Sequence, residues 1–262
     1  MCLIISVLLF SVNRIPPKKE ITEAQKNKTS VDLSVVIKSL SPDLRNRWDR
    51  ISSGFDRSSP AQKVNWKDSA ILFWDTQNRP EIAADFALQK AELTKKPEDL
   101  NYAGQRFYYA VKFIRDLNQQ KTLYGLAAKC FGGVLRLEPN NTDAKIDLAS
   151  CLVEAGDNPM QGISMLREIE KRDSNNVRLQ LSFGFFSAKS QQWDKAIKRF
   201  KKALQLDPSN IEVHLHLANA YEQSGMMIEC VNELQKFVDS TSDPMAKTTI
   251  QDYMQKLKKT NN

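Results

Sequence analysis

The chain has 262 residues, 41% of them hydrophobic and 26% charged, which is the composition of an ordinary globular protein. Its nine glycines and ten prolines argue against collagen-like, linker-like and turn-rich all-β chains, and they favour helices. Lysine and arginine exceed aspartate and glutamate by seven charges, an excess too mild and too evenly spread to indicate a nucleic-acid partner.

The first predicted element is the apolar stretch MCLIISVLLFSV, which precedes Arg14 and Lys18. As a helix its twelve residues rise about 18 Å, less than the roughly 30 Å hydrocarbon layer of a membrane. We expect residues 1–15 to form an uncleaved single-pass membrane anchor, tilted or truncated at its start; a signal peptide and a buried N-terminal segment are the alternatives. Positive charge flanks the stretch only on its C-terminal side, which favours the cytoplasm for the main domain. Residues 16–30 are polar, lack an apolar period and are predicted to be a linker.

A close succession of helices is predicted from residue 31 onward. Ser41 and Ser59 stand directly before prolines, the arrangement of an N-cap followed by proline in the first helical turn, and Pro80 and Pro97 are placed to open further helices. The predicted helices span residues 31–40, 42–55, 60–76, 80–95 and 97–118. Their buried faces are assigned to Trp48, Trp66, Ile71, Trp74, Ile82, Phe86, Tyr108 and Phe113. Because no strand-like alternation interrupts them, the fold class is predicted to be all-α.

The second half of the chain repeats itself. The strings EPNN, DSNN and DPSN begin at positions 138, 173 and 207, so their offsets are 35 and 34 residues. At this spacing large apolar residues share columns, and so do small residues, as expected where helices cross at close range. The large columns are Ile114, Leu148, Phe183, Leu217 and Phe131, Leu166, Phe200, Leu234; the small column is Ala127, Gly162, Ala196, Cys230. The column spacings place the one extra residue of the second unit between Gly156 and Gly162, in a predicted turn.

A 34-residue period that carries Phe183-Gly184, Ala196, Phe200, Ala203 and Pro208 resembles the tetratricopeptide repeat (TPR). The resemblance implies a right-handed α-solenoid of antiparallel helix hairpins with a C-terminal capping helix. We divide the chain into degenerate N-terminal hairpins at 31–107, four repeats at 108–141, 142–176, 177–210 and 211–244, and a capping helix and tail at 245–262. Together with the apolar N-terminus and the linker, this arrangement resembles bacterial membrane-anchored TPR proteins with no assigned biochemical role.

No pattern of catalytic or metal-binding residues stands out. His214 and His216 lie about 200° apart around a predicted helix and cannot chelate one ion; we expect His214 to fill a packing position and His216 to be solvated. The four cysteines lie far apart, and glycine-rich phosphate loops and a GxSxG elbow are missing from the sequence. The cationic run from Lys195 to Lys202 is interpreted as a solvated outer face. We therefore expect a protein that is not an enzyme and that has no cofactor, no metal and no small-molecule substrate.

The resemblance further implies that the first helix of each hairpin lines a concave surface. The residues that the repeat spacing places there are Lys112, Asp116, Asp143, Ile146, Ser150, Arg178, Leu181, Phe185, Lys189, Glu212, Leu215 and Asn219. Arg178 and Lys189 are expected to orient an acidic flank of a partner. Chaperone-binding members of the family clamp a C-terminal carboxylate with a lysine and an asparagine four residues apart, a pair that is incomplete at Lys112 and at Asn219.

An apolar strip with scattered charges suits an extended or amphipathic peptide, so the predicted function is a membrane-tethered scaffold that binds a partner protein. The alternatives are a self-assembling structural component and a nucleic-acid adaptor. A further alternative is that the strip only packs the superhelix.

Overall fold

The computed structural model describes residues 31–156 and 158–260, and all regular structure in these ranges is helical. The elements are α1 (Leu33–Ser39), α2 (Pro42–Arg57), α3 (Pro60–Thr76), α4 (Pro80–Thr94), α5 (Pro97–Ala110), the 3-10 turn η2 (Val111–Phe113), α6 (Leu117–Leu137), α7 (Thr142–Ala155), α8 (Pro159–Arg172), α9 (Val177–Lys189), α10 (Trp193–Leu206), α11 (Glu212–Gln223), α12 (Met227–Ser240) and α13 (Pro244–Thr260). The predicted anchor at 1–15 and linker at 16–30 lie outside the described residues. Within the described ranges, no helix has both the length and the apolar character that a membrane crossing requires.

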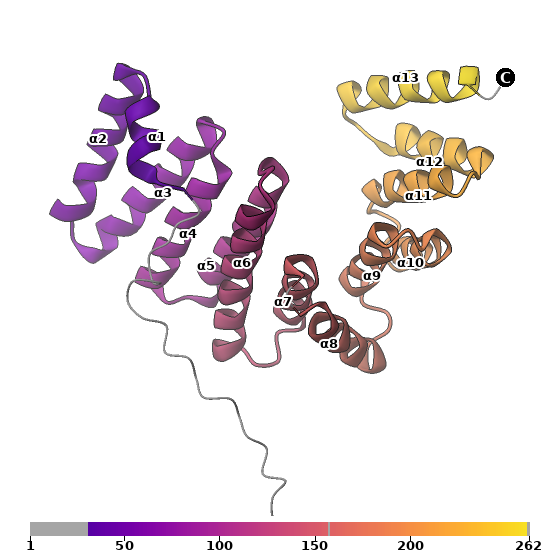
Figure 1. The fold of residues 1–262 in the computed structure, drawn as a ribbon, viewed down its shortest axis with the longest axis horizontal. Coiled ribbons are helices and arrows are strands. Elements are labelled where there is room, and N and C mark those ends of the chain that lie inside the picture. The colour runs from indigo at the N-terminus through magenta and orange to yellow at the C-terminus, as the bar shows by residue number, and fades with distance from the viewer. Residues whose placement is uncertain (1–30, 157, 261–262) are drawn as a thin grey trace, which may run out of the picture.

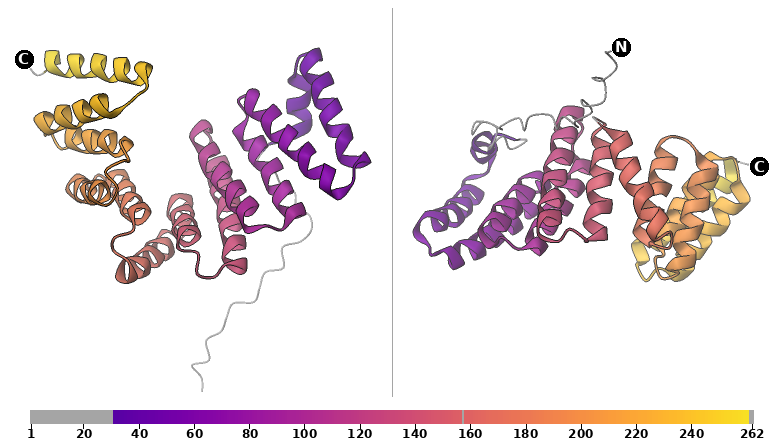
Figure 2. Two further views of the ribbon diagram at one scale, coloured as in Figure 1. Left: turned by 180° about the vertical axis from the view of Figure 1, so that it is seen from behind. Right: turned by 90° about the horizontal axis from the view of Figure 1, so that it is seen from below.

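The helices pack as sequential antiparallel pairs, and the fold is an all-α superhelix. In Figure 1 the chain runs from α1 and α2 down to α8 and then rises to α13, so the stack forms an open arc; Figure 2 shows the same arc from behind and from below. Each helix packs mainly against its neighbours in the chain. The junction between α8 and α9 is an exception, because these two helices touch only slightly.

Helix starts follow the local sequence signals. The Ser59 side chain caps α3 in a capping box with Gln62, and Ser41 accepts a hydrogen bond from the Leu44 amide at the start of α2. Pro80 and Pro97 are the first residues of α4 and α5, as predicted.

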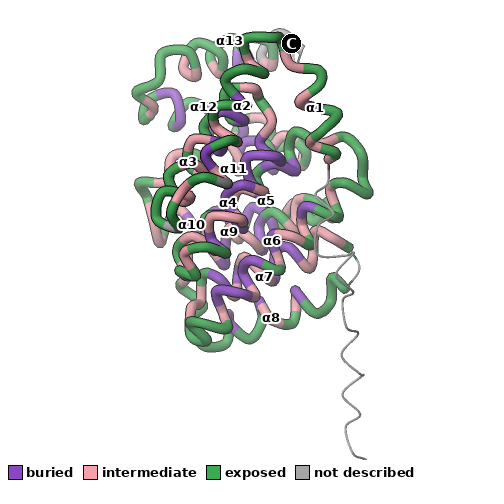
Figure 3. Tube along the Cα trace, turned by 90° about the vertical axis from the view of Figure 1, so that its left-hand side faces the viewer, coloured by how far each residue is buried: buried purple, intermediate pink, exposed green. Residues whose placement is uncertain are grey.

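Burial is concentrated along the middle of the stack, as Figure 3 shows, and it falls into two large clusters of buried residues and a small one between them. The first large cluster is centred on the aromatic residues of α2 to α6, including Trp74 and Phe131, and the second on α10 to α12 around Phe200. The predicted small column is confirmed, because a Cβ added at Gly162 would lie 2.4 Å from the Ala149 carbonyl oxygen of α7. Ala196 of the same column is fully buried.

The helix predicted over 97–118 is wrong at its C-terminal end. α5 stops at Ala110, the short turn η2 follows, and α6 begins at Leu117. The cause is Asp116, whose side chain accepts a 2.8 Å hydrogen bond from the Gln119 amide and so caps a new helix. The hairpin is therefore α5 with α6, which begins upstream of the unit placed at 108–141. By contrast, α7 with α8, α9 with α10 and α11 with α12 lie inside the three later units.

The turns within these three hairpins share one backbone feature. Gly156, Gln191 and Gly225 all adopt a left-handed conformation, with φ of 78°, 58° and 74°. The second helix begins three residues after Gly156 but two residues after Gln191 and after Gly225. The extra residue of the second unit thus lies in its turn, as the column spacings predicted.

The stack ends in α13, which packs against α12. The Asp243 side chain caps it by accepting a 2.9 Å hydrogen bond from the Met245 amide. Met254 is buried, and the Tyr253 hydroxyl donates a 2.6 Å hydrogen bond to Glu222 of α11. One face of α13 therefore packs against the preceding helices.

Candidate functional site

The candidate site is a pocket of about 310 Å³ where the first helices of three consecutive hairpins, α5, α7 and α9, come together. We call it the groove pocket. Its lining residues are Gln105, Tyr108, Tyr109, Lys112, Phe131, Asp147, Ser150, Arg178, Leu181, Ser182 and Phe185. Five residues that the repeat spacing predicted for the groove are therefore brought together here, namely Lys112, Ser150, Arg178, Leu181 and Phe185.

Two large aromatic side chains of the groove pocket remain open to solvent. Tyr109 is 52% exposed and Phe185 is 42% exposed. The Tyr109 ring packs on Phe113, with ring centroids 5.2 Å apart, and the Phe185 ring meets the edge of His216, with centroids 4.7 Å apart. The Phe185 ring also packs on Phe200, with centroids 5.4 Å apart, so both rings are held by aromatic neighbours while part of each residue stays accessible.

The charged groups on α9 are already paired with α7. Arg178 forms ion pairs with Asp147 and, at 3.4 Å, with Asp143, and Lys189 pairs with Glu154. Burial raises the pKa of Asp147, while the Arg178 guanidinium acts in the opposite direction. These ion pairs link α9 to α7 of the preceding hairpin, and the orienting role of Arg178 and Lys189 toward an acidic flank of a partner stays a prediction.

Lys112 differs from these cations. It is exposed on η2, its ammonium group lies 5.5 Å from the centre of the Tyr109 ring, and no carboxylate of the described chain pairs with it. It is close enough to His216 of α11 that its charge lowers the pKa of this imidazole, an effect secondary to burial. Among the described residues, the groove pocket thus contains one cation without a carboxylate partner beside two exposed rings.

The other predicted residues lie elsewhere. Asp116 is the N-cap of α6 and does not line the pocket, and Ile146 is buried in the core. Glu212 and Leu215 line a separate pocket of about 320 Å³ between α11 and the start of α13. Asn219 is exposed on α11 and lines neither pocket. The residues that the repeat spacing placed on one concave surface therefore do not form a single site: some line the groove pocket, some line the pocket beside α11, and others line neither.

The repeat spacing did not assign six lining residues to the groove, namely Gln105, Tyr108, Tyr109, Phe131, Asp147 and Ser182. The first three belong to α5, which the repeat register placed out of phase with the later hairpins. The usable signals were Pro97 at its start and the Asp116 cap just beyond its end, because together they confine the helix to a stretch that contains all three residues.

The histidines follow the expectation in part. His214 is paired with Glu233 of α12 at 2.6 Å, as suits a packing position. His216 is not freely solvated as predicted, because it is half-buried and stacks on Phe200, with centroids 5.6 Å apart. Over the described residues, no group of three histidine, cysteine, aspartate or glutamate side chains has the geometry of a metal site. Burial raises the pKa of Cys130 to about 12, which keeps this thiol protonated at neutral pH.

Comparisons with known proteins agree with this architecture. Residues 188–225, which contain α10 and α11, match the family model described as TPR repeat. Sperm-associated antigen 1 of Rattus norvegicus is 34% identical over 71 residues, which are 27% of this chain and 8% of that protein. The cytochrome c-type biogenesis protein CcmH of Escherichia coli (strain K12) is 26% identical over 87 residues, which are 32% of this chain and 25% of that protein. The chain thus spans a quarter or less of the length of these relatives.

Among solved structures, TTC0263, a thermophilic TPR protein of Thermus thermophilus, superposes with a TM-score of 0.53 at 17% identity. The match covers 72% of this chain and 97% of that one. Such a likeness concerns the fold alone. Residues 188–225 thus match a TPR repeat, and the described helices form a TPR-like superhelix.

Proposed function

We propose that this protein is a non-enzymatic scaffold that binds a peptide segment of a partner protein in the groove pocket, and that its N-terminal segment tethers it to a membrane. The observation that carries the binding proposal is the pair of exposed rings, Tyr109 and Phe185, which line one pocket from two different hairpins. Large aromatic residues near the centre of a binding surface supply much of the binding energy in protein interfaces.

The side chains that line the groove pocket indicate which kind of peptide would fit it. Leu181 and the two rings offer apolar contact, and Lys112 offers one cation that pairs with no carboxylate of the described residues. Arg178 is occupied by Asp147 and Asp143, so it contributes little free charge. The fitting ligand is an extended or amphipathic segment with a large apolar side chain and a single acidic group, rather than a strongly acidic one.

The tether rests on the apolar character of residues 1–15. A tethered scaffold would present its groove to partners close to the membrane surface. The measurement that addresses the tether is given at the end of the Discussion.

The binding proposal is tested by affinity capture with the full chain, identification of the captured proteins by mass spectrometry, and titration of a captured partner. The test variant is Tyr109→Ser with Phe185→Ser. We expect its affinity to fall by about tenfold or more, because each truncated aromatic contact often costs about 2 kcal/mol. Circular dichroism verifies that helicity persists.

The matched control is Leu72→Ser with Ile228→Ser, which also removes two large exposed apolar side chains, here from α3 and α12, outside the pocket. Its affinity should stay within about twofold of the parent protein. If the control pair weakens binding as much as the groove pair, or if neither pair has an effect, the groove pocket is not the binding site.

A further inference from the structure

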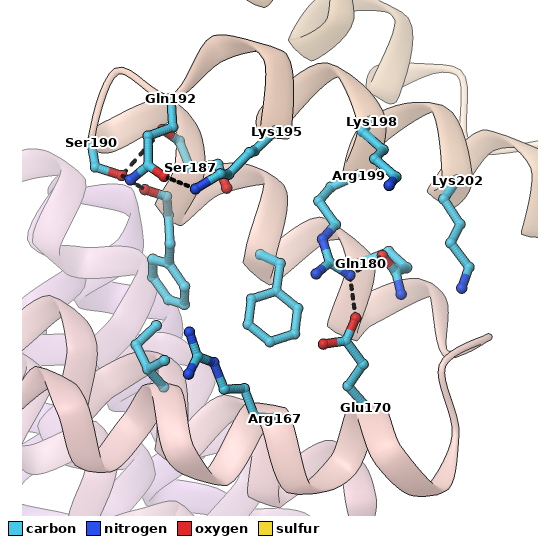
Figure 4. A pocket seen from close by; sticks show the side chains of 13 residues that line it. Arg167, Glu170, Gln180, Ser187, Ser190, Gln192, Lys195, Lys198, Arg199 and Lys202 are labelled. Carbon is cyan, nitrogen blue, oxygen red and sulfur yellow. Dashed lines mark hydrogen bonds and ion pairs between the residues drawn. The ribbon is translucent and has the colours of Figure 1, made fainter.

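A third cavity lies on the other side of α9, between α8, α9 and α10. It has a volume of about 640 Å³, and Figure 4 shows the side chains that line it. It exists because α8 and α9 touch only slightly, so α10 faces α8 across an opening. We call it the cationic cleft, after its charged residues Arg167, Glu170, Lys195, Lys198, Arg199 and Lys202.

One cation of the cleft is fixed by its surroundings. Arg199 forms an ion pair with Glu170 and donates a 3.0 Å hydrogen bond to Oε1 of Gln180. Its guanidinium group also lies 4.6 Å from the centre of the Phe183 ring. Gln180 is fully buried and is itself held, because its Nε2 donates a 2.7 Å hydrogen bond to the Ser174 carbonyl. One wall of the cleft is thus held in a fixed arrangement, in which the Arg199 charge is already paired with Glu170.

The remaining positive charge is not neutralised. Arg167, Lys198 and Lys202 have no ion pair with any carboxylate in the described ranges, and Lys195 donates a 2.6 Å hydrogen bond to the neutral side chain of Gln192. Glu170 is the single acid among the lining residues, against five cations. Like charges that border one cavity repel one another, so an anionic occupant would gain from the four cations that have no carboxylate partner among the described residues.

This finding changes the interpretation of the cationic run on α10. Lys195, Lys198 and Lys202 recur at spacings of three and four, so they lie on one side of the helix, and Figure 4 shows that this side borders the cleft. Arg167 approaches from α8 on the opposite wall. The run is therefore one wall of a cavity rather than a uniformly solvated face.

The floor of the cleft determines which kind of polyanion fits. Ile163, Phe183 and Phe186 give it an apolar part. Phe183 is buried and covered by Arg199, and Phe186 is half-buried, so neither residue presents a fully open ring on which a nucleobase could stack. We propose that the cationic cleft binds an acidic peptide segment of a partner protein, one in which carboxylates alternate with apolar side chains. This site is separate from the groove pocket and does not depend on it.

The test uses the full chain in an uncharged detergent and a defined probe, a fluorescein-labelled twelve-residue peptide in which leucines are separated by glutamates. A second peptide has glutamine in place of every glutamate. Fluorescence anisotropy should show that the glutamate peptide binds about tenfold or more tightly than the glutamine peptide. Equal binding of the two peptides would overturn the proposal.

Two double variants with the same change in net charge locate the site. Lys198→Gln with Lys202→Gln removes two cations of the cleft, and Lys171→Gln with Arg172→Gln removes two exposed cations from the end of α8, outside it. The first pair should weaken the glutamate peptide about tenfold and the second less than about twofold. Equal weakening by both pairs would mean that the peptide responds only to diffuse charge.

Two further measurements distinguish the cationic cleft from the groove pocket and from a nucleic-acid site. The groove variant Tyr109→Ser with Phe185→Ser should bind the glutamate peptide like the parent protein. The two proposals can therefore fail independently: loss of the groove proposal does not affect the cleft proposal, and loss of the cleft proposal does not affect the groove proposal. A single-stranded RNA oligonucleotide should compete only weakly. Tighter binding of RNA than of the peptide, lost in the Lys198→Gln with Lys202→Gln variant, would identify a nucleic-acid site instead and overturn the peptide proposal.

Discussion

Single ionisable residues that are partly buried connect the stability of the stack to pH, and Asp85 of α4 is the clearest case. Burial, together with the nearby charge of Glu92, raises the pKa of its carboxyl group from the ordinary value of 3.8 to about 6. The folded protein therefore holds this proton more tightly than the unfolded chain does. Its contribution to stability is fully present below pH 3.8, the ordinary pKa of the group, and is lost as the pH rises through about 6.

We predict that Asp85→Asn raises the free energy of unfolding at pH 8 by roughly 1 to 3 kcal/mol, because the variant has no charge to bury. At pH 4 the variant and the parent should be nearly equal. Urea denaturation followed by circular dichroism at both pH values measures the difference. Asp49→Asn, at an exposed position of α2, is the control and should show no such change between the two pH values. A gain of the same size for Asp85→Asn at pH 4 and pH 8 would contradict the prediction.

At the scale of elements, the hairpin turns show that different residue types can occupy the same backbone position, which requires a positive φ. Gly156 and Gly225 meet the requirement for a positive φ with glycine, whereas the hairpin of α9 and α10 has Gln191 at this position. A side chain in this region costs about 1 to 2 kcal/mol in backbone strain, partly offset because glycine loses more entropy on folding. A Cβ at Gly225 would have no atom within 4 Å, so the cost at that turn is conformational rather than steric.

We therefore predict opposite effects for reciprocal substitutions. Gln191→Gly should raise the free energy of unfolding by up to about 1 kcal/mol, and Gly225→Gln should lower it by about 0.5 to 1 kcal/mol. Urea denaturation measures both. The control is Gln192→Gly, the same substitution one residue later, where φ is −87° and glycine brings no relief. If Gln192→Gly stabilised the protein as much as Gln191→Gly, backbone strain would not be the cause.

The elements also show what sequence could and could not predict. Proline after a capping serine marked the starts of α2 and α3, and the repeat period matched the helices from α7 to α12, because in both cases the deciding interactions are local or recur at a fixed spacing. The end of α5 was missed because Ile114 fits an apolar column by its chemistry, although it ends the turn η2 in an extended conformation. Chemical similarity in a column does not establish that the backbone is helical there.

The candidate sites show the same limit. The repeat spacing assigned Leu181 and Phe185 to a binding surface, and both line the groove pocket. The ion pairs of Arg178 and the slight contact between α8 and α9 depend on how hairpins are placed relative to one another, and no periodicity encodes that placement. The cationic cleft was therefore not visible in the sequence, although all of its lysines were.

At the scale of the whole molecule, α9 connects the two sites. Successive helical residues are separated by about 100°, so Leu181 and Phe185 lie on one side of α9 while Phe183 and Phe186 lie on the other. The first pair faces the groove pocket and the second the cationic cleft. A change in the packing of α9 at its open junction with α8 would thus affect both cavities.

The described helices form a stack in which each element is stabilised mainly by its neighbours in the chain, and this local character allows the proposed tether to be tested by deletion. Removal of residues 1–15 should leave the helical circular dichroism spectrum and the thermal midpoint unchanged, because the core clusters of the described residues are built from Val31 and from residues of α1 to α13, which the deletion retains. The same deletion should transfer the protein from the membrane fraction to the soluble fraction of a cell lysate, since an apolar anchor supplies roughly 0.8 kcal/mol for each buried methylene group. Substitution of Arg14 and Lys18 by glutamine is the control and should retain the protein in the membrane fraction. A full-length, uncleaved protein found in the soluble fraction would refute the tether and leave both binding proposals to be judged on their own tests.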